Sequence, residues 1–174
     1  GSDTVMLSGE TATGLHPVLA VRTMDKIIRT TEGAPRAWQH KRVDLELGHT
    51  TNAIAFAAVS ASEAWPETRA IITYTVSGGV ARLVSEYRPR APIYAFTPNP
   101  DTYQTLALYW GVIPVLFSPS SEDGETIFID MDNAILNKGL LDHNDRVVIT
   151  VAQPIKKRGS VNVLRLHEVG EMLS

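Results

Sequence analysis

From residue 70 to residue 151 the chain alternates short apolar runs with segments of helical periodicity. The runs are rich in β-branched and aromatic residues, which favours buried strands at 70–74, 93–97, 112–117 and 146–151. Between them, apolar residues recur three or four positions apart, which predicts helices over 80–87, 101–110 and 127–135. Strands that alternate with helices require right-handed crossovers and form a mainly parallel sheet covered on both faces.

The connection after the fourth run is shorter than the others. Residues 152–161 are too few for a helical crossover, so residues 162–167 should return as an antiparallel partner of the fourth strand. We therefore predict an α/β fold, a three-layer α/β/α sandwich whose five-stranded sheet is mostly parallel with the last strand antiparallel. Pro114 within the third run indicates an edge strand or a bulge, because proline cannot donate a hydrogen bond to a neighbouring strand.

A helix should precede the first strand. Thr50 or Thr51 can cap it, and it should run to about Trp65, before Pro66. Its body, residues 53–59, is apolar nearly all round. A helix of that kind is typically buried on more than one side, either in a core or in a subunit contact.

The first 32 residues have the pattern of a detached unit. An apolar run at 4–7 predicts a strand, a polar loop with a glycine follows, and Pro17 suits the first turn of a helix. One strand, one loop and one helix cannot bury their own apolar faces. We therefore divide the chain into this βα unit at 1–32, a charged linker at 33–48 and an α/β domain at 49–174.

Composition excludes several functional classes. The chain has 174 residues and no cysteine, which excludes disulfides, thiolate metal sites and cysteine nucleophiles. The formal net charge of -3 gives no reason to expect nucleic acid or a membrane as a partner, and no apolar run approaches the roughly 20 residues that span a bilayer. The five histidines show no metal-binding spacing. The start lacks an initiator methionine and a signal pattern, so we interpret the chain as cytoplasmic material from within a longer protein.

Several motifs match one enzyme family in order. Residues 3–12 read D-T-V-M-L-S-G-E-T-A. Further on come T-V-S-G at 75–78, R-L-V-S-E-Y-R-P at 82–89 and P-I-Y-A-F-T at 92–97. With these motifs the chain resembles the pyruvate kinase family over essentially all of its 174 residues. The resemblance implies that 1–32 is the last strand, loop and helix of the family's (β/α)8 barrel, followed by its carboxy-terminal regulatory domain.

For the full-length enzyme the resemblance implies phosphoryl transfer from phosphoenolpyruvate to ADP in glycolysis, with Mg²⁺ and K⁺ as cofactors, in a cytoplasmic homotetramer. The metal-holding and charge-neutralising groups of that chemistry sit on earlier barrel strands in the family, which this chain does not contain. Only Ser8 and Glu10 match positions that line the family's catalytic site. We therefore expect the chain alone to be inactive as a kinase, with no metal or cofactor of its own.

A second candidate site needs no barrel. The segment T-V-S-G-G at 75–79 joins the end of a strand to the start of a helix, where hydroxyls, glycines and free N–H groups suit a phosphate. A strand order of 3-2-1-4-5 would reverse between the first and fourth strands, and ligands favour that crevice. The loop after the fourth strand carries the densest basic cluster in the chain, so we expect the two loops to face each other across one cleft. The residues expected to bind a phosphorylated effector are Thr75, Ser77, Gly78, Gly79, Lys156, Lys157, Arg158 and Gly159.

The resemblance favours the same region, because the family's allosteric sugar-phosphate effectors bind there. The chain departs from the family at two places. Gly79 and Val80 stand where strongly effector-responsive members often have two hydroxyl residues, and Gln153 stands where many members have glycine. The alternative interpretation is a solvated basic turn beside an ordinary glycine-bearing loop.

Two functions from different classes remain. The first is a regulatory and oligomerisation domain of a metabolic kinase, with subunit contacts through the apolar helix at 53–59 and the reversed last strand. The second is a free-standing module that binds a sugar phosphate or a nucleotide and has no enzymatic activity. A stand-alone enzyme of another class would need a clustered acid, base or nucleophile, and the sequence offers none.

Overall fold

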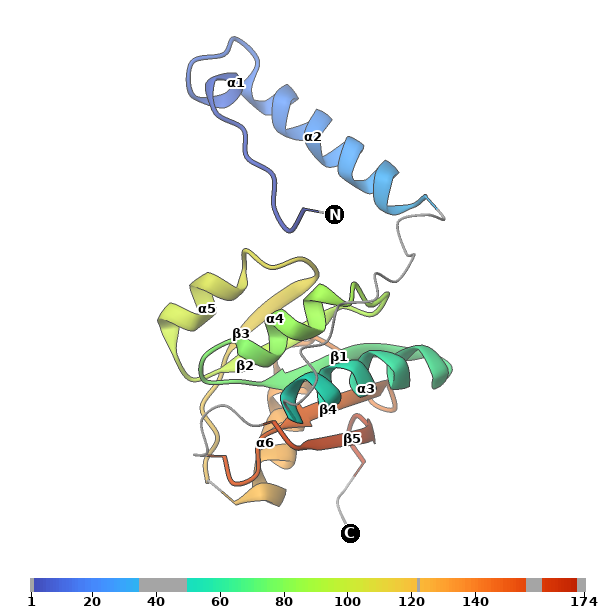
Figure 1. Ribbon diagram of the computed structural model, residues 1–174. Coiled ribbons are helices and arrows are strands. Elements are labelled where there is room, and N and C mark those ends of the chain that lie inside the picture. Colours follow the sequence, from blue (N-terminus) through green and yellow to red (C-terminus); the bar gives the residue numbers. More distant parts are fainter. Residues whose placement is uncertain (1, 35–49, 122, 156–160, 172–174) are drawn as a thin grey trace. The chain divides into compact units, whose positions relative to one another are not determined.

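The computed structural model describes residues 2–34, 50–121, 123–155 and 161–171 (Figure 1). The chain divides into two compact units, Gly1–Lys41 and Arg42–Ser174. Most of the predicted linker, residues 35–48, lies outside the described residues.

The first unit contains a short helix, α1 (Gly9–Ala12), and a long one, α2 (Pro17–Glu32). Pro17 takes the first turn of α2 as predicted, since its missing N–H costs nothing there. The prediction of a strand at 4–7 is wrong, because these residues are not in a strand in the structure. An apolar run becomes a strand only by hydrogen bonding to a neighbouring strand, and the described residues of this unit offer no such neighbour.

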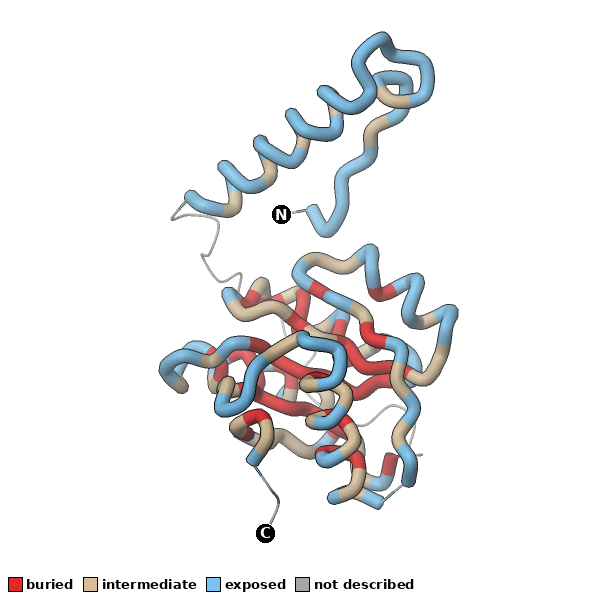
Figure 2. Tube along the Cα trace, turned by 180° about the vertical axis from the view of Figure 1, so that it is seen from behind, coloured by how far each residue is buried: buried red, intermediate tan, exposed pale blue. Residues whose placement is uncertain are grey.

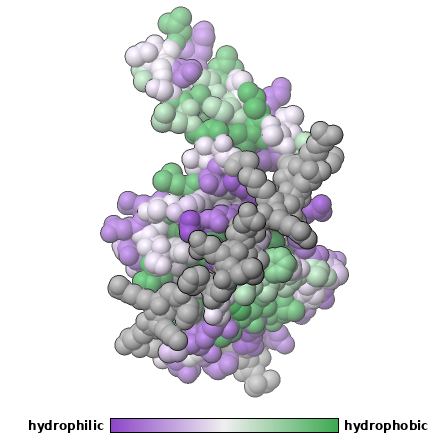
Figure 3. Space-filling view, viewed as in Figure 1, coloured by the Kyte–Doolittle hydropathy of each residue, from purple (hydrophilic) through white to green (hydrophobic). Residues whose placement is uncertain are grey.

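Apolar side chains of the first unit are exposed. Figure 3 shows hydrophobic residues on its surface, and an open groove of about 440 Å³ runs along α2 and the turn before it. The large side chains with more than half of their area exposed include Met6, Leu15, Val18, Leu19 and Ile27. Such a surface favours the interpretation that this unit belongs against a larger apolar partner.

The second unit holds one sheet of five strands. They are β1 (Thr68–Tyr74), β2 (Ile93–Thr97), β3 (Val112–Leu116), β4 (Arg146–Val151) and β5 (Val163–Glu168). Their order is β3-β2-β1-β4-β5, and all neighbours are parallel except β4 and β5, which are antiparallel. The predicted order and the reversed last strand are confirmed. Pro114 lies on the edge strand β3, where proline is tolerated.

Helices cover both faces of this sheet. α3 (Thr50–Ala64) and α4 (Gly79–Glu86) lie on one face, and α6 (Gly124–Asn137) lies on the other. The position of α3 agrees with the helix predicted from Thr50 or Thr51 to about Trp65. The layers therefore follow as helix, sheet and helix, which confirms the predicted α/β/α fold.

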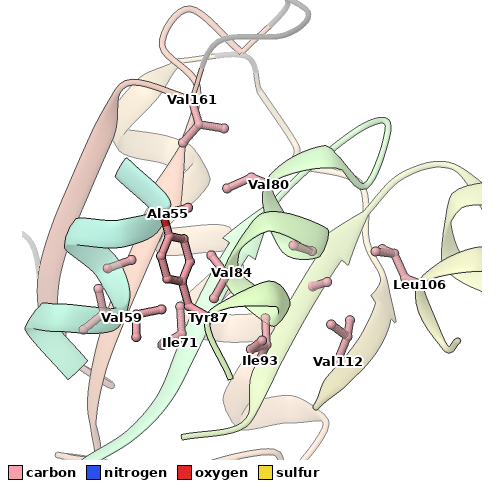
Figure 4. Packing of buried hydrophobic residues seen from close by; sticks show 14 residues of the cluster. Ala55, Val59, Ile71, Val80, Val84, Tyr87, Ile93, Leu106, Val112 and Val161 are labelled. Carbon is pink, nitrogen blue, oxygen red and sulfur yellow. The ribbon is translucent and has the colours of Figure 1, made fainter. Parts of the chain in front are cut away.

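The core forms on both sides of the strands. Side chains of β1 alternate, so that Ile71 packs with α3 and α4, and Ile72 packs with α6. Figure 2 shows the strands as the most continuously buried part of the unit, and Figure 4 shows the cluster under α3 and α4. Both clusters are almost entirely aliphatic or aromatic, so burial of apolar surface holds the layers together.

The helix α5 (Pro100–Leu106) is shorter than the one predicted over 101–110. After Leu106 the chain turns, with the Tyr109 N–H donating to the Leu106 carbonyl. Gly111 then adopts φ +68° immediately before β3 begins. The predicted helix was too long because the chain has to reverse direction here to place β3 beside β2.

The reversed strand β5 is tied to α6 by a buried polar contact. His167 of β5 is 2% exposed, and its Nε2 lies 3.0 Å from Oδ1 of Asp132 on α6. The other carboxylate oxygen, Oδ2, accepts a hydrogen bond from the Gly170 N–H at 2.7 Å. Asp132 therefore joins a helix, the last strand and the turn after it.

Candidate anion-binding site

The loop at 75–79 connects the carboxyl end of the central strand β1 to α4. Thr75 is buried, and its Oγ1 accepts a hydrogen bond from the Gly78 N–H at 2.9 Å. Gly78 is the N-cap residue of α4 and has φ +83°, a left-handed conformation that glycine adopts without strain. Thr75 and Gly78 therefore fold the predicted loop into a tight turn at the start of α4.

The amino end of α4 is accessible to a negatively charged ligand. Its N-cap residue, Gly78, has no side chain, so it supplies no side-chain oxygen to the first-turn N–H groups. Ser77 is exposed and Gly79 is half-buried, so a ligand can reach this turn. Free N–H groups and the positive end of the helix dipole attract negative charge, which makes phosphate a suitable ligand.

The loop after β4 is closed at its base by Asn162. The Asn162 side chain accepts a hydrogen bond from the Gln153 N–H at 2.7 Å and donates one to the Gln153 carbonyl, also at 2.7 Å. Ile155 and Val161 flank residues 156–160 and are buried in the clusters on opposite faces of the sheet. These contacts hold both described ends of the loop on the sheet.

The two loops leave the sheet next to each other, at the carboxyl ends of β1 and β4, where the strand order reverses. Val161, after the second loop, and Val80, in the first turn of α4, belong to the same buried cluster (Figure 4). One turn contains four of the eight predicted binding residues, Thr75, Ser77, Gly78 and Gly79. The other four lie outside the described residues: Lys156, Lys157, Arg158 and Gly159.

Sequence patterns did not indicate three residues that support these loops. Thr102 of α5 donates from its Oγ1 to the Val76 carbonyl at 2.9 Å, across a separation of 26 positions. Leu106 of the same helix lies against Gly78, so α5 supports the turn from behind. Asn162 closes the other loop. No local motif marks such residues, because their partners are distant in sequence.

Gln153, at a position where the resemblance implies glycine in many members, packs against α6. A Cβ placed on Gly124, the first residue of α6, would meet the side-chain amide of Gln153. The glutamine therefore covers the start of α6, and the glycine leaves room for it. This contact lies with the helix on the opposite face of the sheet from α4.

Known proteins share this domain. Residues 52–167 match the family model described as "Pyruvate kinase, alpha/beta domain". The chain belongs to the pyruvate kinase family. The pyruvate kinase of Geobacillus stearothermophilus is 36% identical over 178 residues, which cover 100% of this chain and 30% of that enzyme. The pyruvate kinase of Clostridium acetobutylicum is 36% identical over 171 residues, which cover 97% of this chain and 36% of that enzyme.

The chain thus spans about a third of the length of the curated pyruvate kinases it matches. Ser8 and Glu10, the two residues predicted to belong to the catalytic site of the whole enzyme, lie at the start of α1 in the first unit. Hydrogen bonds from the backbone N–H groups of Glu10 itself and of Ser8 lower the pKa of the Glu10 carboxyl. Both side chains are exposed, so the described part of this unit does not enclose a substrate around them.

A hollow of about 560 Å³ lies at the opposite ends of the strands from this site, at the amino ends of β1 and β4. Four of its charged side chains form two ion pairs: Arg69 with Asp145 at 3.3 Å, and Arg146 with Glu168 at 3.1 Å. Ligands of open α/β sheets favour the carboxyl ends of the strands. We therefore place the candidate site at 75–79 and not in this hollow.

Neither a metal centre nor a membrane span is found in the part of the chain that the structure describes. Within those ranges, no three histidine, aspartate or glutamate side chains are grouped so that they could hold an ion. None of the helices there is both long and apolar enough to cross a bilayer.

Proposed function

We propose that this chain is the carboxy-terminal part of a cytoplasmic pyruvate kinase, the glycolytic enzyme that transfers phosphate from phosphoenolpyruvate to ADP to give pyruvate and ATP. The match of residues 52–167 to the family's α/β domain supports this proposal. We expect parts of the enzyme outside this chain to hold the Mg²⁺ and K⁺ of the whole enzyme, so the chain alone would not catalyse the reaction.

Within that enzyme, we assign the α/β domain a regulatory role, the binding of a phosphorylated effector. The observation that supports this role is the uncapped amino end of α4 beside Gly78, at the point where the strand order reverses. A phosphate there would accept hydrogen bonds from the first-turn N–H groups of α4 and from the Ser77 hydroxyl. Lys157 and Arg158 on the neighbouring loop would neutralise a second anionic group. A sugar phosphate or a nucleotide has the required chemistry.

Thermal unfolding of the chain with inorganic phosphate, a sugar bisphosphate or ADP tests this role. A ligand that binds only the folded state should add about 2.7 kcal/mol of stability at a concentration of 100 Kd. The double substitution Lys157→Glu and Arg158→Glu should abolish the shift, because it replaces attraction of the anion by repulsion.

The matched control is the double substitution Arg90→Glu and Lys138→Glu. It makes the same change in net charge at two exposed residues, on the loop after α4 and at the end of α6, away from the start of α4. It should leave the ligand-induced shift in place. A chain that none of the three ligands stabilises at millimolar concentration would contradict the effector role, while the family assignment would stand.

We further infer that the domain mediates self-association, as part of a homotetramer in the whole enzyme. The apolar helix α3 leaves Phe56 51% exposed, and β5 is an edge strand of the sheet. Exposed apolar surface and unpaired strand edges both favour contact with a second copy. Light scattering at high protein concentration should therefore show dimers or larger species. A strict monomer would contradict this role for the chain.

The competing function is a free-standing phosphate-binding module without enzymatic activity. The second unit has a core on both faces of its sheet, which favours independent folding. The coding sequence upstream of Gly1 separates the two functions. A continuous reading frame that contains the barrel would support the kinase, and a start codon close to Gly1 would support the module.

A further inference from the structure

Two buried threonines on neighbouring strands have hydroxyls that lack a hydrogen-bond partner in the described structure. Thr73 of β1 and Thr150 of β4 are paired in register, and each is 0% exposed. Neither Oγ1 is hydrogen bonded. By contrast, a backbone partner is present for each of the other buried serine and threonine hydroxyls in the described ranges, those of Ser62, Thr75, Ser85 and Thr97.

Both threonines face α3 and α4. Ile71, two residues before Thr73, belongs to the cluster under these helices. So does Val148, two residues before Thr150, and strand side chains return to the same face every second residue. Neighbouring strands lie about 4.8 Å apart, so the two hydroxyls are within reach of one shared partner. Thr75, two residues after Thr73, follows the end of β1 and lies in the candidate phosphate turn.

A buried hydroxyl without a partner is costly, and a valine of the same shape would avoid that cost. Here two such hydroxyls lie in register and create a polar site at the edge of an apolar cluster. Each hydroxyl can donate and accept, and a buried water molecule requires about two to four polar partners. We propose that Thr73 and Thr150 together bind one internal water molecule, which links β1 to β4 where the strand order reverses. This site does not depend on the effector role proposed above.

A high-resolution crystal structure of the chain tests the proposal directly. It should show an ordered water about 2.8 Å from both Oγ1 atoms. The proposal is overturned if the two hydroxyls bond to each other or to backbone carbonyls, or if no density lies between them.

Substitution by valine tests it independently. Thr73→Val and Thr150→Val each remove one partner of the water, and each should lower the unfolding midpoint by about 3–8 °C. The double variant removes the water with both partners, so its midpoint should fall by less than the sum of the two single effects. A single variant that raises the midpoint, or strictly additive effects, would count against the water site.

The matched control pair combines Thr97→Val with Thr150→Val. Thr97 is also 0% exposed and lies at the end of a strand, but its Oγ1 accepts a hydrogen bond from the Asn99 N–H at 3.3 Å. Its effect should add to that of Thr150→Val, because the two hydroxyls share no partner. Coupling between Thr97 and Thr150 as strong as that between Thr73 and Thr150 would overturn the proposal.

Discussion

Replacing Phe96 by alanine is expected to lower the free energy of unfolding of the α/β unit by about 3–5 kcal/mol. Phe96 is 0% exposed on β2, and its ring lies edge-on to that of Phe117 at a centroid distance of 5.3 Å. The side chain fills space between the sheet and α6, so its truncation removes contacts and leaves a cavity. Urea denaturation followed by circular dichroism measures the loss.

Two further variants calibrate this result. Leu108→Ala removes an apolar side chain that is 60% exposed, and it should change the free energy of unfolding by less than about 0.5 kcal/mol. Phe96→Leu retains part of the buried volume and should fall between the two alanine variants. If Phe96→Ala lowered the free energy of unfolding no more than Leu108→Ala, the result would contradict the packing of Phe96 between the sheet and α6.

Replacing Gly78 by alanine is expected to destabilise the same unit by about 1–3 kcal/mol. Gly78 has φ +83°, where a side chain strains the backbone. A Cβ there would also lie 3.2 Å from Cδ2 of Leu106 and 3.4 Å from Cγ2 of Thr102, so α5 would have to move slightly. Strain and crowding act together, and the urea titration used for Phe96 measures their sum.

Gly79→Ala is the matched control for Gly78→Ala. Gly79 is the next residue and begins α4, and a Cβ there would meet only the Ser77 hydroxyl at 3.8 Å, an ordinary contact distance. Alanine at a compatible helical position should be neutral or stabilising by up to about 1 kcal/mol. Equal losses at both positions would show that the turn does not require the left-handed conformation of Gly78.

Much of the sheet could be predicted from local sequence. The strands predicted at 93–97 and 146–151 coincide with β2 and β4. Each is a run of β-branched and aromatic residues, and a proline or charged residues precede it, so composition marks where it begins. The link at 152–161 was short enough to require an antiparallel return, which β5 confirms.

Two predictions about local structure were wrong, and the cause was the same. The apolar run at 4–7 forms no strand, and the helix predicted to 110 ends at Leu106. A strand needs a neighbour to pair with, and the end of α5 depends on where β3 must begin. Neither requirement is visible in the residues themselves.

Only part of the candidate site could be predicted from local sequence. The loop at 75–79 could be predicted, because a few consecutive residues mark the end of a strand and the start of a helix; the left-handed conformation of Gly78 was found only in the structure. The supports of both loops, Thr102 and Asn162, emerged only from the folded structure. Their partners are reached through other elements, so no local pattern could indicate them.

The sequence by itself determined the family, the α/β class and the order of its elements, because periodicity and turn chemistry act over a few residues. Only the tertiary structure decided that Asp132 joins α6 to β5 and that Thr73 and Thr150 lie in register on one face. These contacts depend on strand register and on which helix covers which face of the sheet. Both are set by packing between segments far apart in the chain, after the local elements have formed.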